Sequence, residues 1–339
     1  MKYPIGIQEF EKIINGGYVY VDKTALIYRL VTEGSIYFLS RPRRFGKSLL
    51  VSTLECYFRG RKELFRGLAI DSLEKEWAQY PVFHIDFNGT NFTQGGALEE
   101  TIEKFLTDQE EIYGKNPNSK NIGNRFIDLL KAAHQQTGRR AVVLIDEYDK
   151  PILQAIGNES LQDEFRSTLK AFYGVLKSAD ADLKFTLLTG VTKFGKVSVF
   201  SDLNNLKDIS ASPHFCDICG LTAQELHKNF DIAVEQLAKA NNQTKEQAYE
   251  ELERRYDGYH FCENTIGIYN PFSILWTLSE SRYGSYWFST GTPTYLMELM
   301  KKSGFLLEDL SRIEVGADTL DSIHSADVNP IPVLFQSGY

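Results

Sequence analysis

A short loop between a strand-like run and a helix-like run constrains the fold of this chain more than any other stretch. The loop spans residues 40–48 and reads SRPRRFGKS; it follows the apolar run 36–39 and precedes the helical run 49–54. A strand, a tight loop ending in Gly-Lys-Ser and a helix form the context in which loop N–H groups and a helix N-terminus bind phosphate. The stretch therefore predicts a phosphate-binding loop of the Walker A kind.

Three residues of this loop have the chemistry that such a site needs. Gly46 lets the backbone approach a phosphate without a Cβ. Lys47 would reach the β- and γ-phosphates, and the Ser48 hydroxyl would ligate Mg²⁺. In the usual pattern, G-x-x-x-x-G-K-[ST], the first glycine falls on Arg41 of this chain. The alternative is a basic turn before an amphipathic helix, but the flanking strand and helix favour the phosphate loop.

The residues around Gly-Lys-Ser are further candidates for nucleotide binding. Phe45 and Leu49 flank the tripeptide directly. Arg43 and Arg44 either pair with acidic groups of the protein or contact phosphate.

A second constellation follows the apolar run 141–145, which is typical of a buried parallel strand. Asp146 and Glu147 close this run, as in a Walker B motif. Asp146 would hold Mg²⁺ through its water shell, and Glu147 would orient or deprotonate the water that attacks the γ-phosphate. The alternative is two solvated acids, but a preceding phosphate loop favours catalysis. We expect Asp149 and Lys150 to form a solvated pair at the next helix start.

Thr189 ends another apolar run, 184–188. Its hydroxyl either contacts the γ-phosphate or its water, or serves as a hydrogen-bonding group at the strand end. The residues alone leave both interpretations open.

Strands and helices alternate from residue 36 to residue 220, which predicts an α/β fold with a parallel, doubly wound sheet. The last strand is expected at 214–220. Thr222 and Glu225 form a capping-box pattern that opens a mostly helical region. We therefore expect a nucleotide-binding core over 1–220, a helical lid over 221–285 and the start of a C-terminal module over 286–339. We expect Val333, Leu334 and Phe335 in this module to be partly exposed, as if a partner domain were missing.

Composition narrows the class of protein. Of 339 residues, 42% are hydrophobic and 24% are charged, which is ordinary for a globular protein. The net charge of −8 does not favour nucleic acid as a partner, although a local basic patch stays open. No signal-peptide pattern and no membrane-length apolar run occur, and the four cysteines are few, so we expect a cytoplasmic protein with no membrane partner. Cys216-x-x-Cys219 favours structural thiols over zinc or redox chemistry.

The sequence also bears on the choice of base. Thr192-Lys193-Phe194-Gly195 is similar to the guanine-reading N/T-K-x-D signature, but Gly195 stands where the acid should be. Without that carboxylate, guanine N1 and N2 lose their acceptor, so the sequence favours ATP over GTP.

Several distinctive motifs across the whole chain resemble one family, the AAA-ATPase-like proteins of prokaryotes. These motifs are KYPIGIQEF from residue 2, YVDKT from 20, SRPRRFGKS from 40, LIDEYDKP from 144, LTGVTKF from 188, YDGYHF from 256, YNPF from 269 and WFSTGTP from 287. The resemblance implies a P-loop NTPase core of the additional-strand type, like AAA and signal-transducing (STAND) ATPases, with strand order 5-1-4-3-2 and a helical lid. Family members often continue into a domain resembling PD-(D/E)XK nucleases, an effector that these residues do not include.

The resemblance also implies roles for individual residues. Gly46, Lys47 and Ser48 correspond to the phosphate and Mg²⁺ ligands, Asp146 to the metal-side acid, Glu147 to the catalytic acid and Thr189 to a sensor. The adenine pocket is expected around Ile5, Gly6 and Val21, with lid residues near 256–259.

The combined prediction is an ATPase that uses Mg²⁺ and couples hydrolysis to an attached effector domain. The alternatives are a nucleotide-gated interaction module with little turnover and a nucleic-acid-processing ATPase. Homo-oligomerisation stays open.

Overall fold

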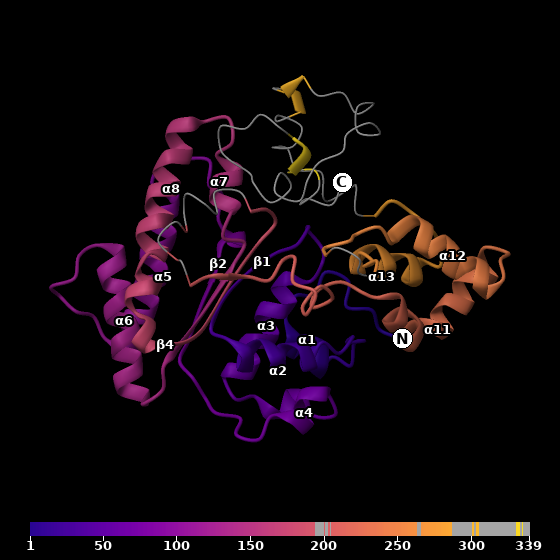
Figure 1. Ribbon diagram of the computed structural model, residues 1–339, viewed down its shortest axis with the longest axis horizontal. Coiled ribbons are helices and arrows are strands. Elements are labelled where there is room, and N and C mark those ends of the chain that lie inside the picture. Colours follow the sequence, from indigo (N-terminus) through magenta and orange to yellow (C-terminus); the bar gives the residue numbers. More distant parts are fainter. Residues whose placement is uncertain are drawn as a thin grey trace.

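A five-stranded parallel sheet carries the helices of the chain (Figure 1). The computed structural model describes residues 1–193, 200, 203, 205–262 and 266–286, together with 300, 301, 303, 304, 330–332 and 334. The strands are β1 (Ile36–Ser40), β2 (Val82–Asp86), β3 (Ala141–Asp146), β4 (Leu183–Gly190) and β5 (Lys207–Asp208). Their spatial order is β2-β3-β4-β1-β5, which is the expected order 5-1-4-3-2 in reverse. The predicted α/β class with a parallel sheet is therefore confirmed.

Helices lie on both faces of this sheet and in a separate group beyond its edge. The longer ones are α2 (Thr24–Glu33), α3 (Lys47–Phe58), α5 (Ala97–Tyr113), α6 (Ile122–Thr137), α8 (Glu159–Tyr173), α11 (Ala223–Ala240), α12 (Lys245–Tyr256) and α13 (Pro271–Glu280). The shorter ones are α1 (Phe10–Asn15), α4 (Ala69–Leu73), α7 (Lys150–Gln154), α9 (Val175–Ser178), η1 (Lys62–Phe65), η2 (Phe87–Gly89) and η3 (Asp180–Asp182).

Alternation along the strands divides the core between the two faces of the sheet. Phe38, Val143 and Ile145 pack with the apolar residues of α5, α6 and α8. Tyr37 and Leu144 pack on the opposite face, with α2 and α3. Because both faces are covered, most of the strand residues are apolar. The carboxyl ends of the strands are the places where a ligand can reach polar groups of the sheet.

The predicted strand at 214–220 is wrong. The edge strand is β5, which pairs in parallel with β1 through Tyr37 opposite Lys207 and Phe38 opposite Asp208. The backbone after β5 makes turns instead, with the Phe215 amide bonded to Ser212 O and the Ile218 amide bonded to Phe215 O. Short-range turn hydrogen bonds use the donors that a strand would need.

Helices α11, α12 and α13 form a helical module with its own apolar core, drawn at the right of Figure 1. The predicted capping box is confirmed, since Thr222 Oγ1 accepts from the Glu225 amide and Glu225 Oε2 accepts from the Thr222 amide. Glu225 also pairs with Lys23 at 2.5 Å. Tyr3 and Val21 pack against the module core, so the N-terminal segment lies between the module and the sheet domain.

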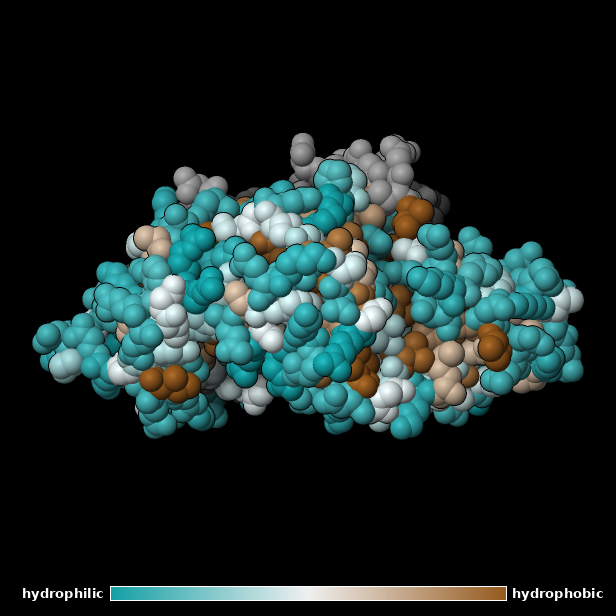
Figure 2. Space-filling model, turned by 90° about the horizontal axis from the view of Figure 1, so that it is seen from below, coloured by the Kyte–Doolittle hydropathy of each residue, from teal (hydrophilic) through white to brown (hydrophobic). Residues whose placement is uncertain are grey.

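The surface offers no broad apolar face in the view of Figure 2, where hydrophilic residues dominate and hydrophobic ones occur in small groups. Within the described parts of the chain, no helix combines the length and the apolarity needed to cross a lipid bilayer. The expectation of partial exposure is wrong for Leu334, which is 4% exposed and belongs to the same apolar cluster as Phe38. Val333 and Phe335, like most of the segment 286–339, lie outside the described residues.

Arg41 takes the place of the usual first loop glycine, and its side chain turns inward. The residue is 1% exposed. Its guanidinium donates to the carbonyls of Ser210 at 2.7 Å, Phe215 at 3.3 Å and Cys216 at 3.2 Å, and it lies 4.0 Å from the ring centroid of Phe261. One arginine therefore ties the loop to the segment after β5 and to the approach to α13.

Restoring the glycine should harm the protein. We expect Arg41→Gly to lower the free energy of unfolding by about 2–5 kcal/mol, because buried carbonyls lose a charged donor and a cavity opens. Arg66→Gly is the control, since Arg66 is exposed and lies outside any helix; it should change stability by less than about 1 kcal/mol. Urea unfolding of both variants tests this. Equal effects would mean that Arg41 does not hold these segments together.

Candidate functional site

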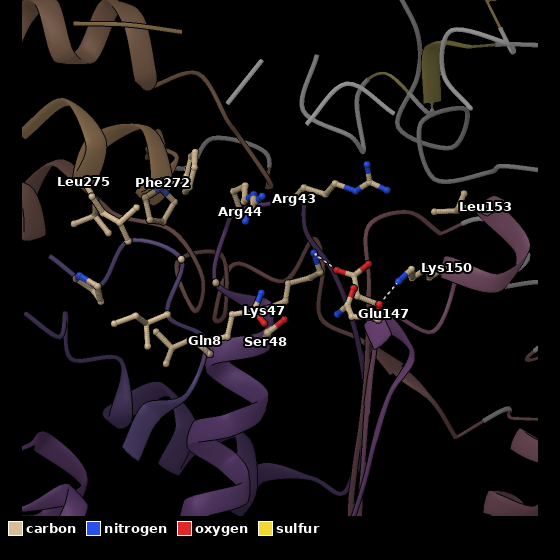
Figure 3. A pocket seen from close by; sticks show the side chains of 18 residues that line it. Gln8, Arg43, Arg44, Lys47, Ser48, Glu147, Lys150, Leu153, Phe272 and Leu275 are labelled. Carbon is tan, nitrogen blue, oxygen red and sulfur yellow. Dashed lines mark hydrogen bonds and ion pairs between the residues drawn. The ribbon is translucent and has the colours of Figure 1, made fainter. Parts of the chain in front are cut away.

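A cavity of about 390 Å³ opens at the carboxyl edge of the sheet, beside the N-terminus of α3 (Figure 3). This is the edge at which open α/β sheets bind ligands. Nine of the sequence-predicted residues line it: Ile5, Gly6, Arg43, Arg44, Gly46, Lys47, Ser48, Leu49 and Glu147. The loop before α3 and the end of β3 are thus brought to one site.

Lys47 lies at the first position of α3 and is 4% exposed. Its ammonium is 3.2 Å from Glu147 Oε1 and also donates to the carbonyls of Arg41 at 3.1 Å and Pro42 at 3.4 Å. Gly46 before it has φ of +94°, a left-handed conformation that strongly favours glycine. The loop therefore turns sharply and aims the ammonium of Lys47 into the cavity.

Glu147 has an unusual backbone as well. Its φ is +56°, in the left-handed region that non-glycine residues seldom adopt, and Arg44 on the loop has φ of +69°. The turn after β3 is held by the Tyr148 amide bonded to Thr189 O at 2.9 Å and by the Lys150 amide bonded to Glu147 O at 3.1 Å. Such conformations cost about 1–3 kcal/mol each and cluster at functional sites.

Asp146 and Thr189 form a pair behind the cavity rather than on its wall. Asp146 is 2% exposed, and Thr189 on the neighbouring strand is fully buried. The Thr189 hydroxyl donates to Asp146 Oδ1 at 2.5 Å. In this structure, therefore, Thr189 bonds to the acid at the end of the adjacent strand. Glu147 lines the cavity and Asp146 does not, although they are neighbours in sequence.

The expected solvated pair of Asp149 and Lys150 is wrong. Asp149 is fully buried and accepts hydrogen bonds from the amides of Val191 and Thr192 and from the Thr192 hydroxyl. Burial, and then the Glu147 carboxylate, raise the pKa of Asp149 above its usual range. Lys150 instead lines the cavity and donates to Asn88 O at 2.5 Å. Asp149 thus fixes the turn that carries Glu147 to the segment after β4.

The flanking loop residues divide into two kinds. Arg43 and Arg44 are exposed to the cavity, and neither forms an ion pair with an acid among the described residues. Arg44 lies 4.9 Å from the ring centroid of Phe272 on α13. Phe45 is 1% exposed and packs edge-on against Tyr259 at 4.7 Å, so its side chain anchors the loop to the chain near α13.

A second cavity of about 110 Å³ adjoins the first and is mostly apolar. Val21, Leu49 and Phe45 are among its lining residues, whereas Ile5 and Gly6 line the larger cavity. Five residues line both: Pro4, Gly46, Leu49, Pro271 and Leu275. The N-terminal segment is therefore at the site, as expected, but residues 256–259 line neither cavity. The helical module contributes α13 instead.

The residues fit a bound Mg²⁺ only in part. Ser48 places its hydroxyl on the cavity wall, whereas the Asp146 carboxylate lies behind it. Among the described residues, no three His, Cys, Asp or Glu side chains are grouped so as to hold a metal ion. Cys216, Cys219 and Cys262 are buried, and none of these three forms a disulfide. A magnesium ion here would need phosphate and water for most of its ligands, as this ion commonly does.

Sequence reasoning missed several residues on the cavity wall: Pro4, Gln8, Asn88, Lys150, Phe272 and Leu275. Pro271 and Phe272 belong to the motif at 269–272, and Lys150 belongs to the motif at 144–151. Both motifs could therefore have indicated that these residues lie at the site. Their position at the cavity depends on how α13 packs against the N-terminal segment, which no local pattern reveals.

Comparison with known proteins agrees with this geometry. Residues 4–200 match a family described as "Predicted AAA-ATPase". A protein of Azotobacter chroococcum mcd 1, described as an uncharacterized protein in the vnfD 5′ region, is 38% identical over 340 residues. The match covers 100% of this chain and 63% of that relative, so the chain spans less than two thirds of its length. No solved structure matches. The family match covers β1 to β4, the loop and the acids at the end of β3, and the chain belongs to the AAA-ATPase-like family.

Proposed function

We propose that the protein binds ATP in the larger cavity and hydrolyses it with Mg²⁺. The observation that supports this most strongly is the pairing of Lys47 and Glu147 at 3.2 Å on the cavity wall. A cation at the start of a helix and an acid at the end of a buried parallel strand are what phosphoryl transfer needs from the protein. The membership of the AAA-ATPase-like family supports nucleotide binding in general.

The loop would bind the phosphates. The N-terminus of α3, a helix of 12 residues, presents unpaired N–H groups and the positive end of its dipole to the cavity. A triphosphate would draw the Lys47 ammonium from Glu147 toward the β- and γ-phosphates. Arg43 and Arg44 have no carboxylate partner among the described residues, so both are available to the phosphates.

Glu147 would act as the general base. Once Lys47 moves to phosphate, the carboxylate on the cavity wall can accept a proton from water. Ser48 would hold Mg²⁺, with Asp146 reached through bound water. The ion supplies charge neutralisation of the phosphates. Thr189 would act by positioning Asp146, to which it already donates.

The base would occupy the smaller, apolar cavity beside Val21 and Leu49, with Ile5 nearby. Among its described lining residues there is no Asp or Glu, so guanine N1 and N2 would find no carboxylate. Phe194 and Gly195 lie outside the described residues. The apolar lining supports adenine.

The helical module would serve as a lid of the additional-strand ATPase type. From α13, Pro271 and Leu275 line both cavities, and Phe272 lines the larger one. Movement of α13 on nucleotide binding could then be passed to an effector domain. The greater length of the Azotobacter relative leaves room for such a domain.

A nucleotide-gated module with little turnover is the second candidate. The observation in its favour is Asp146, whose carboxylate lies off the cavity wall and is already bonded to Thr189. If that arrangement persists with nucleotide bound, the metal would be held weakly and hydrolysis would be slow.

Lys47→Ala should abolish tight ATP binding. The β- and γ-phosphates lose the one ammonium that the loop itself fixes at the helix start. Lys239→Ala is the control, because Lys239 is exposed on α11 and lines neither cavity. Calorimetry with ATP and Mg²⁺ measures both variants. Wild-type affinity in Lys47→Ala would refute the phosphate-loop assignment.

The two acids should respond differently to neutralisation. Glu147→Gln should lower single-turnover hydrolysis by roughly 10²–10⁴-fold and leave ATP affinity unchanged or tighter, because Lys47 is freed from its carboxylate. Asp146→Asn should change the Mg²⁺ dependence of binding together with the rate. Loss of affinity alone in both variants would mean that these roles are wrong, and wild type without turnover would favour the gated module.

ATP should displace a fluorescent nucleotide far better than GTP. The reason is the lack of an acid in the described lining of the apolar cavity. Equal competition by the two nucleotides would contradict the assignment of this cavity to the base.

A further inference from the structure

Among the described residues, Lys150 is the one lysine besides Lys47 that lines the larger cavity, and the proposed function gives it no role. It begins α7 and stands on the far side of Glu147 from the loop (Figure 3). Its ammonium donates to Asn88 O at 2.5 Å and makes no ion pair with a described carboxylate. Among the described residues, the partner of this cation is therefore a neutral backbone carbonyl.

The main chain of Lys150 is held firmly in place. Its amide closes a turn on Glu147 O at 3.1 Å. The preceding residue, Asp149, is fully buried and bonded to Val191 and Thr192. The Asn88 carbonyl is positioned in turn by Asp86, whose Oδ1 accepts from the Asn88 amide at 2.8 Å. Lys150 is thus fixed at both its backbone and its ammonium.

The charges on the cavity wall do not balance. Arg43, Arg44, Lys47 and Lys150 face a single acid, Glu147, among the described lining residues. Among the described residues, Glu147 is within ion-pair distance of Lys47 only. Burial lowers the pKa of Lys150, and the Arg43 guanidinium acts in the same direction, while Glu147 and Asp86 oppose the shift. A partly buried ammonium among other cations gains most from an anionic ligand.

We infer that Lys150 binds the terminal phosphate of the nucleoside triphosphate. This inference rests on the proposed function. If Glu147 activates the attacking water, the terminal phosphate must lie near Glu147, and Lys150 approaches from the side opposite the loop. A group in that position contacts the γ-phosphate and not the α- or β-phosphate. Lys150 thus supplies from within the chain a cation against the charge of the transferring phosphoryl group.

The consequence is a specific discrimination between triphosphate and diphosphate. Lys150→Met should weaken binding of a non-hydrolysable ATP analogue by about 10- to 100-fold, the range for a hydrogen bond between charged groups. ADP affinity should stay within about twofold. Lys150→Gln is a second neutral variant, and Lys150→Arg should restore much of the preference for the triphosphate. The control is Lys177→Met, an exposed lysine on α9 away from the cavity.

Calorimetry with both nucleotides and Mg²⁺, together with thermal unfolding of each unliganded variant, separates the outcomes. A lowered ratio of triphosphate to diphosphate affinity with an unchanged unfolding temperature supports the inference. Unchanged affinities, or equal losses for both nucleotides, would overturn the role of Lys150 and leave the proposed function standing. Wild type that binds neither nucleotide would overturn both.

Discussion

The ion pair between Lys47 and Glu147 joins the loop before α3 to the end of β3, and it depends on the parallel sheet that brings these two segments together. The two residues lie far apart in the sequence, and parallel β1 and β3 bring their following segments to one edge of the sheet with β4 between them. Both side chains are largely removed from water, with 3% and 13% of their side-chain surface exposed. Separating such a pair is costly unless another charge replaces the lost partner. We propose that this requirement makes the site selective for a polyanion with its own cation, such as Mg²⁺-nucleotide.

The loop reaches this geometry without its usual first glycine. Arg41 continues the β1–β4 ladder through its amide, which bonds to Gly190 O at 3.1 Å, and then sends its side chain inward. Its own carbonyl accepts a hydrogen bond from Lys47. The same residue therefore supports the loop lysine and joins the core to the segment that leads toward α13. We therefore expect that a shift of the loop on phosphate binding would be passed to the helical module through Arg41 and through the contact of Phe45 with Tyr259.

Much of the fold could be predicted because its signals are local. The apolar runs at 36–39 and 141–145 and the capping box at Thr222 each follow from a few neighbouring residues, and strand order came with the family resemblance. The strand expected at 214–220 failed because its carbonyls accept from Arg41, a partner remote in sequence. Asp149 was expected at the surface, but the segment after β4, which is remote in sequence, provides buried hydrogen-bond donors for its carboxylate. Local sequence pattern was enough to identify Lys47 and Glu147 as site residues. The part of the cavity wall that α13 forms depends on tertiary packing, which a local pattern does not reveal.

The most direct test of the central claim is a crystal structure of the protein with Mg²⁺ and a non-hydrolysable ATP analogue. We predict that the phosphates occupy the loop before α3 and that the Lys47 ammonium leaves Glu147 Oε1, now 3.2 Å away, for a phosphate oxygen. Glu147 should then face a water molecule near the terminal phosphate. A nucleotide bound elsewhere, or a Lys47–Glu147 pair that persists beside bound nucleotide, would contradict the account.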